Sequence, residues 1–385
     1  MTEDWRHGGF GLYIHWPYCE AKCPYCDFNS HVSQTIDQSA WADAYLSELD
    51  RYAALTPGRV LNSVFFGGGT PSLMNPDTVA RVLERIRQHW TVANDFEVTL
   101  EANPSSVEAG RFRAYAEAGI NRVSMGIQAL NDADLKRLGR LHSVAEAQTA
   151  FDIARSCFGR VSFDLIYARQ DQTLDHWRRE LGEALSMAID HLSLYQLTVE
   201  PGTAFGERHK IGKLRGLPAE DLSVDMYELT QDLCSAAGMP AYEVSNHAQP
   251  GFESRHNLIY WRHGDYIGIG PGAHGRVTLN GVRRATEAYA LPDIWLKRAA
   301  SGETEKPNES ISREDQASEL LIMGLRLSEG IDLARFNGLS EGSLNASKLS
   351  DLSTLEFVEI KGTHLRTTAQ GRLVLNSVIS ELLAP

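Results

Sequence analysis

The 385-residue sequence predicts an α/β fold: a partial (β/α)6 barrel of the TIM type, followed by a small α+β winged-helix-like domain. Two observations carry this prediction. Six short apolar runs alternate with helical patterns, the order that builds a parallel sheet with right-handed crossovers. Polar or glycine-rich features then follow these runs at their C-terminal ends, where the active sites of barrels form. The second observation favours a barrel over a doubly wound open sheet.

The six expected strands are rich in Val, Ile, Phe and Tyr, and several are apolar at consecutive positions, as in strands buried on both faces. They span residues 11–16, 60–68, 96–104, 122–130, 160–168 and 191–201. The stretches between them carry apolar residues at i, i+3 and i+4, the helical spacing. Asn75 and Pro76 are typical of a helix start, and Gly119 is typical of a helix stop.

After about residue 240 this alternation breaks down. Residues 241–277 are rich in Gly, His and aromatic residues and read as strands and functional loops. The polar segment 301–310 reads as a linker, and beyond it the pattern predicts a helix, a hairpin and a final helix. We therefore expect a barrel core over 1–240, an extension packed on it over 241–300, and a C-terminal domain over 311–385.

Composition and charge narrow the class of protein. The net charge of −13 disfavours nucleic-acid binding, which needs a basic face. No apolar run approaches the ~20 residues of a membrane span, and the N-terminal sequence lacks the apolar region of a signal peptide. The five cysteines then indicate a cytoplasmic protein with reduced thiols. Cys157 and Cys234 stand in apolar surroundings and read as core residues.

The other three cysteines, Cys19, Cys23 and Cys26, lie within eight residues. They could form a structural zinc site with His31 as the fourth ligand, or a redox pair at the CxxC spacing. They could also hold an iron–sulfur cluster, in which three thiolates leave one iron open to bind a further ligand. A c-type haem attachment site is excluded, because Asp27 and not His follows the third cysteine.

Several residues at the other strand ends are candidates for ligand binding. The glycine run that ends in Thr70 is either a flexible turn or a place where a ligand approaches the backbone. Glu101 and Asp164 are flanked by apolar strand residues, which favours inward positions over the solvated surface. Gln128 and Thr198 also stand near strand ends. Arg140 is equally compatible with an exposed helix position and with a carboxylate contact.

The last candidate motif is HNLIYW, with His256, Tyr260 and Trp261, followed by the segment DYIGIGPGAHG with His274. Taken alone, these residues are most simply a strand with core aromatics. Histidine is, however, an axial ligand of haem, and tyrosine and tryptophan pack on porphyrin faces. The motif therefore leaves both interpretations open.

Taken together, seven segments resemble the HemW family of radical S-adenosylmethionine (SAM) haem chaperones, which is related to oxygen-independent coproporphyrinogen III dehydrogenase. The segments are YIHWPYCEAKCPYCDFNSH, FFGGGTPS, LEANPSS, SMGIQALN, LKRLGRLHS, HNLIYW and GDYIGIGPGAHG. The resemblance implies a radical SAM barrel with a HemN-type C-terminal domain. It implies a 4Fe–4S cluster on Cys19, Cys23 and Cys26, haem contacts by His256, Tyr260 and Trp261, and SAM contacts by Tyr13, Gly68, Gly69, Thr70, Glu101, Gln128, Arg140, Asp164, Thr198 and His274.

The resemblance also implies a function, namely binding haem and passing it to an acceptor apoprotein. One candidate acceptor is a respiratory, membrane-associated protein, which would bring this cytoplasmic chain to the inner membrane through its partner; a homodimer is one expected oligomeric state. The alternative is the dehydrogenase activity itself, in porphyrin biosynthesis. Dehydrogenases carry a further cysteine in a CxC arrangement where this chain has Asp27 and Phe28, and this departure favours the chaperone.

A second departure concerns the loop after the fifth expected strand. This chain reads Ala168-Arg169-Gln170 there, where relatives usually have Gly-Leu-Pro. The motif residue Asp164, which precedes the loop, is retained.

Overall fold

The computed structural model describes residues 3–33, 35–107, 109–340 and 342–384. Six parallel strands form the centre of its large sheet, in the order in which they occur along the chain. They are β1 (Phe10–Trp16), β4 (Val60–Gly68), β5 (Thr91–Ala102), β6 (Arg122–Gln128), β7 (Arg160–Tyr167) and β8 (His191–Gln196). The predicted α/β barrel-type fold is confirmed, with each parallel strand near its expected position.

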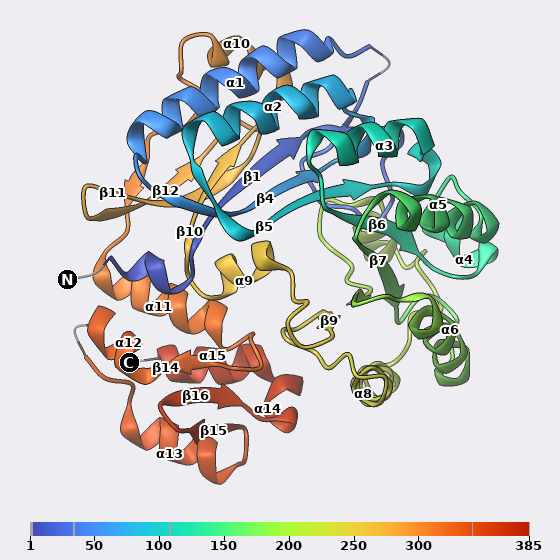
Figure 1. Ribbon diagram of the computed structural model, residues 1–385. Helices are drawn as coiled ribbons and strands as arrows, with labels where there is room; N and C mark the ends of the chain where they lie inside the picture. The colour runs from blue at the N-terminus through green and yellow to red at the C-terminus, as the bar shows by residue number, and fades with distance from the viewer. Residues whose placement is uncertain (1–2, 34, 108, 341, 385) are drawn as a thin grey trace.

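The helices between these strands cover the outer face of the sheet (Figure 1). They are α1 (Gln38–Leu55), α2 (Pro76–His89), α3 (Ala109–Ala118), α4 (Asp132–Arg137), α5 (Val144–Cys157) and α6 (Leu174–Met187), and two more helices, α7 (Ala204–Lys210) and α8 (Glu220–Ala236), follow β8. The side chain of Asn75 caps α2 as expected, since its Oδ1 accepts the N–H of Asp77 at 3.1 Å. Gly119 follows the end of α3 with a φ of 111°.

The sheet continues on both sides of the six parallel strands but does not close. Short β9 (Asn246–Ala248) pairs antiparallel with β8, and β10 (Asp265–Ile269) pairs parallel with β1. Three antiparallel strands follow β10: β11 (His274–Leu279), β12 (Val282–Glu287) and β13 (Glu309–Ser310). In the described part of the chain β9 and β13 are the two free edges, so the sheet is a partial barrel.

Two more helices belong to this half of the molecule. The helix α9 (Arg255–Trp261) packs on β4, β10 and β1 on the inner side of the curved sheet, opposite α1 and α2 (Figure 1). The helix α10 (Pro292–Ala299) packs on α1, where Trp295 stacks on Trp41 at 5.5 Å between ring centroids. The region after residue 240 therefore extends the main sheet and fills its concave side.

The C-terminal residues form a smaller unit with its own apolar core, coloured orange to red in Figure 1. The predicted helix, hairpin and final helix are present as α11 (Arg313–Gly324), the pair β15 (Val358–Lys361) and β16 (His364–Thr367), and α15 (Leu375–Leu383). Between and around them lie β14 (Ile331–Asp332), α12 (Leu333–Leu339), α13 (Ala346–Thr354) and α14 (Ala369–Leu373). The sheet order is β14-β16-β15.

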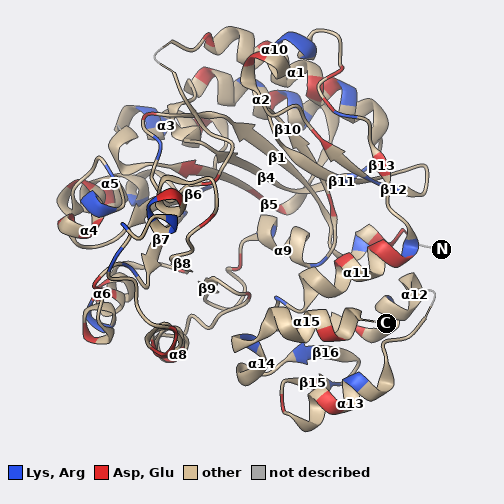
Figure 2. Ribbon diagram, turned by 180° about the vertical axis from the view of Figure 1, so that it is seen from behind, with Lys and Arg blue, Asp and Glu red and all other residues tan. Residues whose placement is uncertain are grey.

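Charged contacts join this unit to the rest of the chain. Arg335 on α12 donates to both carboxylate oxygens of Asp4, each at 2.8 Å, and Arg276 on β11 pairs with Glu319 on α11 at 2.9 Å. Lysine and arginine are interspersed with acidic residues on outer helices such as α6 and α13 (Figure 2). Among the described residues, no helix combines the length and the apolar character that crossing a membrane requires.

Candidate functional site

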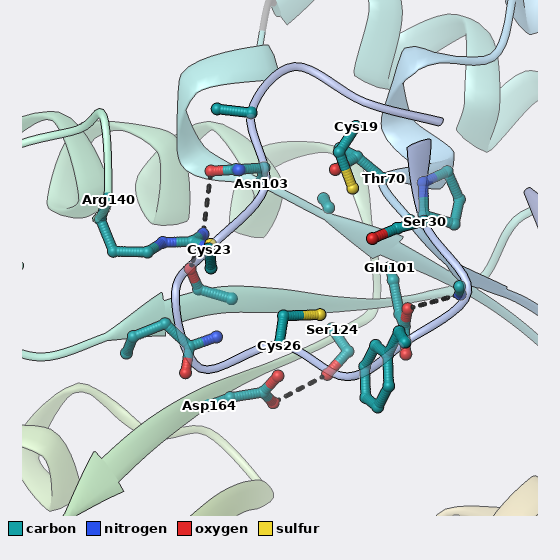
Figure 3. A pocket seen from close by; sticks show the side chains of 18 of the residues that line it. Cys19, Cys23, Cys26, Ser30, Thr70, Glu101, Asn103, Ser124, Arg140 and Asp164 are labelled. Carbon is teal, nitrogen blue, oxygen red and sulfur yellow. Dashed lines mark hydrogen bonds between the residues drawn. The ribbon is translucent and has the colours of Figure 1, made fainter. Parts of the chain in front are cut away.

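The three clustered cysteines lie on one loop that is closed by a short parallel strand pair. Strands β2 (Tyr18–Cys19) and β3 (His31–Val32) flank the loop, and the N–H of His31 also donates to the carbonyl of Pro17 at 2.7 Å. A turn within the loop is held by the N–H of Cys26, which donates to the carbonyl of Cys23 at 3.2 Å. All three thiols line one cavity at the C-terminal ends of the parallel strands, here called the thiol cavity (Figure 3).

The spacing that a mononuclear zinc site requires can be set against the thiols of this loop. Among the described residues, no three His, Cys, Asp or Glu side chains converge closely enough to hold a single metal ion. Thiolates on one zinc must lie about 4 Å apart, because each Zn–S bond is about 2.3 Å. Three thiolates that bind three different irons of a cluster are more widely spaced. The described residues thus contain no preformed mononuclear site at this loop.

The protonation of the thiols bears on how a cluster would bind. Burial raises the pKa of Cys19 and Cys26 above the ordinary thiol value. Cys19 and Cys26 are therefore protonated at neutral pH, and iron would have to displace these two protons to form thiolate bonds. We expect cluster assembly to release protons and to be favoured by higher pH.

The glycine turn after β4 packs directly on the cysteine loop. The N–H of Gly69 donates to the carbonyl of Trp16 at 2.7 Å, and the N–H of Thr70 donates to that of Tyr18 at 2.8 Å. A Cβ on Gly69 would lie 2.6 Å from the Tyr18 oxygen, so only glycine allows this approach. Gly68 has a φ of 110°, which also favours glycine. The turn thus fixes the start of the cysteine loop and lines the thiol cavity.

Two carboxylates face the thiol cavity from β5 and β7 (Figure 3). Glu101 accepts the N–H of Gly68 at 3.2 Å, and Asp164 accepts the hydroxyl of Ser124 at 3.3 Å. Burial, and next the charge of Asp164, raise the pKa of Glu101 to about 8; burial raises the pKa of Asp164 to about 6. A cationic ligand would relieve this repulsion, so the pair is suited to bind a positively charged group.

Arg140 reaches the same cavity from the loop after α4. One guanidinium nitrogen lies 3.3 Å from the Cys23 sulfur, and the other donates to Asn103 Oδ1 at 3.1 Å and to the Gly126 carbonyl at 2.7 Å. Gln128 also lines the cavity and has a φ of 76°, a backbone conformation that costs energy in a residue other than glycine. The guanidinium of Arg140 therefore places a fixed positive charge beside the thiols.

A second cavity adjoins the first and is here called the aromatic cavity. It is lined by Tyr13, His15, Phe28, Asn29, Gly68, Glu101, Tyr260, Tyr266, Gly272, Ala273 and His274. Phe28, Gly68 and Glu101 line both cavities. The hydroxyl of Tyr13 lies 2.9 Å from His15 Nδ1, and His15 Nε2 lies 2.9 Å from the Asn29 carbonyl. The cysteine loop is thereby tied to β1.

The predicted haem residues on α9 point in two directions. His256 and Tyr260 are one helical turn apart and face the sheet, whereas Trp261 lies at the surface of α9 that meets the C-terminal unit. His256 is only 4% exposed and stacks on Phe65 at 4.5 Å between ring centroids. The three side chains therefore do not share one surface.

The structure thus brings most of the predicted SAM residues together in the thiol cavity, and places Tyr13 and His274 in the aromatic cavity. Thr198 is exposed after β8 and lines neither cavity. Sequence reasoning missed Asn103, Ser124 and His15. Asn103 lies in the segment LEANPSS and His15 in the segment YIHWPYC. In each segment, a polar residue among apolar strand residues could have indicated a functional side chain.

Residues 13–182 match the family model of the Radical SAM superfamily, and residues 311–374 match that of the HemN C-terminal domain. The structure of coproporphyrinogen III oxidase (HemN) from Escherichia coli, a radical SAM enzyme, superimposes with a TM-score of 0.80 over 97% of this chain and 90% of that chain. With 21% identity, this similarity establishes the fold. The chain is a radical SAM protein.

Full-length relatives narrow the assignment further. The haem chaperone HemW of Escherichia coli is 38% identical over 97% of this chain and 98% of its own length. The mitochondrial radical S-adenosyl methionine domain-containing protein 1 of Danio rerio is 37% identical over 97% of this chain and 86% of its own length. The chain belongs to the HemW family.

Proposed function

We propose that this protein is a haem chaperone that binds haem, transfers it to an acceptor protein, and carries a 4Fe–4S cluster with exchangeable SAM. The observation that carries the proposal is the identity of 38% along almost the whole chain to a protein named as a haem chaperone. The thiol cavity supports the cluster, because three thiols and no fourth cysteine line it among the described residues. One iron would then stay open for SAM.

Different residues of the chain would hold the cluster and SAM. Cys19, Cys23 and Cys26 would ligate the cluster, which supplies electrons and an open coordination position when bound. The Glu101–Asp164 pair would accept hydrogen bonds from the SAM amine and ribose, and the Gly68–Thr70 turn would offer backbone groups. Arg140 would pair with the SAM carboxylate, with Gln128 beside it. Thr198 lies outside both cavities and has no part in this proposal.

The alternative function is oxidative decarboxylation of coproporphyrinogen III, which the fold would also accommodate. Asp27 and Phe28 stand where dehydrogenases carry a further cysteine. Phe28 is 59% exposed and lines both cavities, so an apolar ring occupies the rim between the cluster loop and the neighbouring space. A thiol at this rim could take part in redox chemistry, whereas phenylalanine cannot. We therefore expect no coproporphyrinogen dehydrogenase activity.

The proposal also covers partners and location. The proposed cargo is haem, and the proposed acceptor is a haem-free apoprotein, for which a respiratory, membrane-associated protein is one candidate. Delivery to such an acceptor would place this cytoplasmic protein at the inner membrane through its partner.

An anaerobic assay of the reconstituted protein tests the proposal. The protein is incubated with coproporphyrinogen III, SAM and a strong reductant, and in parallel with haem followed by an apo-haem protein. We expect about one haem per chain, transfer to the apoprotein, and no protoporphyrinogen IX. Formation of protoporphyrinogen would favour the dehydrogenase instead, and failure to bind haem would overturn the chaperone function.

A further inference from the structure

The end of α7 and the turn after it expose a run of cations, although the chain as a whole has a net charge of −13. This stretch, residues 208–215, is here called the basic segment. Its four cations are Arg208, Lys210, Lys213 and Arg215, all exposed, and the nearest acidic residue in the sequence is Glu207. Among the described residues, none of the four forms an ion pair with a carboxylate. Their charges therefore face solvent without compensation.

The basic segment is held in one conformation. Phe205, just before it, and Leu214, near its end, are buried in an apolar cluster with Leu138 from the end of α4. The N–H groups of Lys213 and Leu214 both donate to the carbonyl of Arg208, at 2.8 and 3.2 Å. A surface that is already ordered loses less conformational entropy when a partner binds to it.

The basic segment lies beside the cysteine loop. The N–H of Phe205 donates to the carbonyl of Pro24 at 2.8 Å, and the Phe205 ring lies 6.4 Å from that of Tyr25 between centroids. The loop after α4 approaches the same proline, because a Cβ on Gly139 would lie 2.6 Å from Pro24 Cδ. Three segments of the chain therefore meet next to the thiol cavity, which Tyr25 lines.

Each of these three segments exposes a large apolar side chain. Ile211 of the basic segment and Leu141 of the loop after α4 are each 62% exposed, and Phe28 of the cysteine loop is also exposed. Apolar side chains and arginine on one part of a surface are typical of protein–protein interfaces. Covering these side chains would contribute a favourable hydrophobic free energy to binding.

The charges indicate what kind of partner fits this surface. The net negative charge of the chain repels an acidic partner, and the basic segment attracts it, so electrostatic steering would bring such a partner to this face. A uniformly anionic surface such as a lipid bilayer fits less well, because Asp27 is exposed beside Phe28 and would face the same negative layer. A folded protein can place a cation opposite Asp27 and carboxylates opposite the basic segment.

We propose that the basic segment is the docking surface for the haem-accepting protein, and that the acceptor presents an acidic face to it. The inference rests on the proposed chaperone function and specifies the chemistry of the partner. The docked acceptor lies beside the thiol cavity and leaves the outer helices of the barrel uncovered. Because the contact depends on exposed charges, docking and haem transfer weaken as the salt concentration rises.

Two forms of one model acceptor test this inference with the full-length, anaerobically reconstituted protein. They are apomyoglobin with its natural surface and apomyoglobin in which exposed lysines are replaced by glutamate. Isothermal titration calorimetry measures the affinity of each form for the haem-free protein, and stopped-flow absorption measures haem transfer from the loaded protein. At about 20 mM NaCl we expect the acidic form to bind and to accept haem about tenfold better, and most of this preference to disappear at about 200 mM NaCl.

A charge-matched pair of variants locates the docking surface. The test variant neutralises the basic segment and should lose the preference for the acidic acceptor: Arg208→Gln, Lys210→Gln, Lys213→Gln and Arg215→Gln. The control variant removes the same charge from exposed positions on α3, α5 and α6 and should keep the preference: Arg113→Gln, Arg155→Gln, Arg178→Gln and Arg179→Gln.

The outcomes separate this inference from the function on which it rests. If the wild-type protein shows no saturable haem binding, the chaperone function fails, whatever the affinity for the acceptor. If the wild type binds haem but treats both acceptors alike, or if the test and control variants lose the preference equally, the docking surface is wrong. If the test variant keeps the preference but no longer sediments with vesicles that contain phosphatidylglycerol, the basic segment faces lipid and not the acceptor.

Discussion

The guanidinium of Arg140 lies 3.3 Å from the sulfur of Cys23, so a fixed positive charge touches one of the three candidate cluster ligands. The same guanidinium donates to Asn103 and to the Gly126 carbonyl, which holds it in place. Its Nε is buried without a hydrogen-bond partner among the described residues. A positive charge fixed beside a thiolate stabilises negative charge on that thiolate and on a cluster bound to it.

Replacing Arg140 with Gln is expected to lower the reduction potential of the reconstituted cluster. The reduced cluster is more negative and loses a neighbouring cation, which would shift the midpoint by on the order of 50 mV, equivalent to roughly 1 kcal/mol for one electron. Arg140→Lys keeps the charge and should shift it less. A redox titration followed by electron paramagnetic resonance measures both. The exposed Arg137→Gln on α4 is the control, and an unchanged midpoint in Arg140→Gln would contradict the prediction.

The raised pKa of Glu101, about 8, predicts that SAM binds more tightly as the pH rises from 6 to 8. The cationic ligand favours the ionised carboxylate, so binding at pH 6 must first remove a proton. Isothermal titration calorimetry in buffers of different ionisation enthalpy measures both the affinity and the protons released. In Glu101→Gln the affinity should be weaker, and its remaining pH dependence should be confined to the lower end of this range, where Asp164 titrates. A wild-type affinity without pH dependence would contradict the interpretation.

The same pKa has a consequence for the stability of the protein without ligands. Because the folded pKa lies above the ordinary value of 4.5, the folded state holds its proton more tightly than the unfolded state. The resulting destabilisation is absent near pH 4 and grows as the pH rises to about 8. Glu101→Gln should therefore raise the free energy of unfolding at pH 8 by on the order of 4 kcal/mol, and change it little at pH 4.

Urea denaturation of the apoprotein at both pH values checks this expectation. The exposed Glu84→Gln on α2 is a matched control and should change neither value by more than about 0.5 kcal/mol. Equal effects of Glu101→Gln on the free energy of unfolding at the two pH values would show that the cost of ionising a buried carboxylate does not cause the change in stability.

Gly68 allows a test of the glycine turn, with a second glycine of positive φ as the control. A Cβ at Gly68 would meet the His15 ring at 2.6 Å and the Trp16 carbonyl at 2.8 Å, in addition to the cost of a φ of 110°. Gly58 has a φ of 72°, but no atom lies within 4 Å of a Cβ built there. Gly68→Ala should lower the unfolding free energy by about 3 kcal/mol and Gly58→Ala by about 1 kcal/mol. Chemical denaturation measures both, and similar losses would remove the packing argument.

The sequence predicted the parallel strands and the convergence of their ends for one physical reason. Buried parallel strands are apolar on both faces, and their C-terminal ends share an edge, so Cys19, Gly68, Glu101 and Asp164 had to meet. Thr198 does not join the other strand-end residues, because the chain leaves the sheet after β8 towards α7 and Thr198 is exposed. The order of the strands predicts which residues meet at one edge of the sheet. It does not predict which of their side chains turn inward.

Other features depend on contacts that no local pattern records. Strand β10 inserts beside β1 although about 250 residues separate them, and this pairing places His274 next to Tyr13 and creates the aromatic cavity. The burial of His256 under Tyr260 arises from the packing of α9 on β4, which a six-residue motif cannot reveal. Side-chain contacts such as that of Arg140 with Cys23 likewise follow from the assembled fold.

The loop after β7 contains a buried ion cluster. Arg169 is 3% exposed and donates to Asp134 at 3.0 Å and to Glu180. Glu180 also accepts the N–H of Leu130 at 2.7 Å. The loop thereby ties α6 to α4, the helix that precedes Arg140. Arg169 thus supports the wall of the thiol cavity.

Replacing Arg169 with Met should be strongly destabilising, because it leaves the buried Glu180 carboxylate without its cation. The expected loss is about 3–5 kcal/mol of unfolding free energy, measured by urea denaturation. Adding Glu180→Gln to Arg169→Met removes the unpaired charge and should recover part of that loss. The exposed Arg178→Met on α6 is the control, with an expected change below about 0.5 kcal/mol. A loss below about 1 kcal/mol in Arg169→Met, or no recovery in the double variant, would show that the ion cluster does not hold this loop.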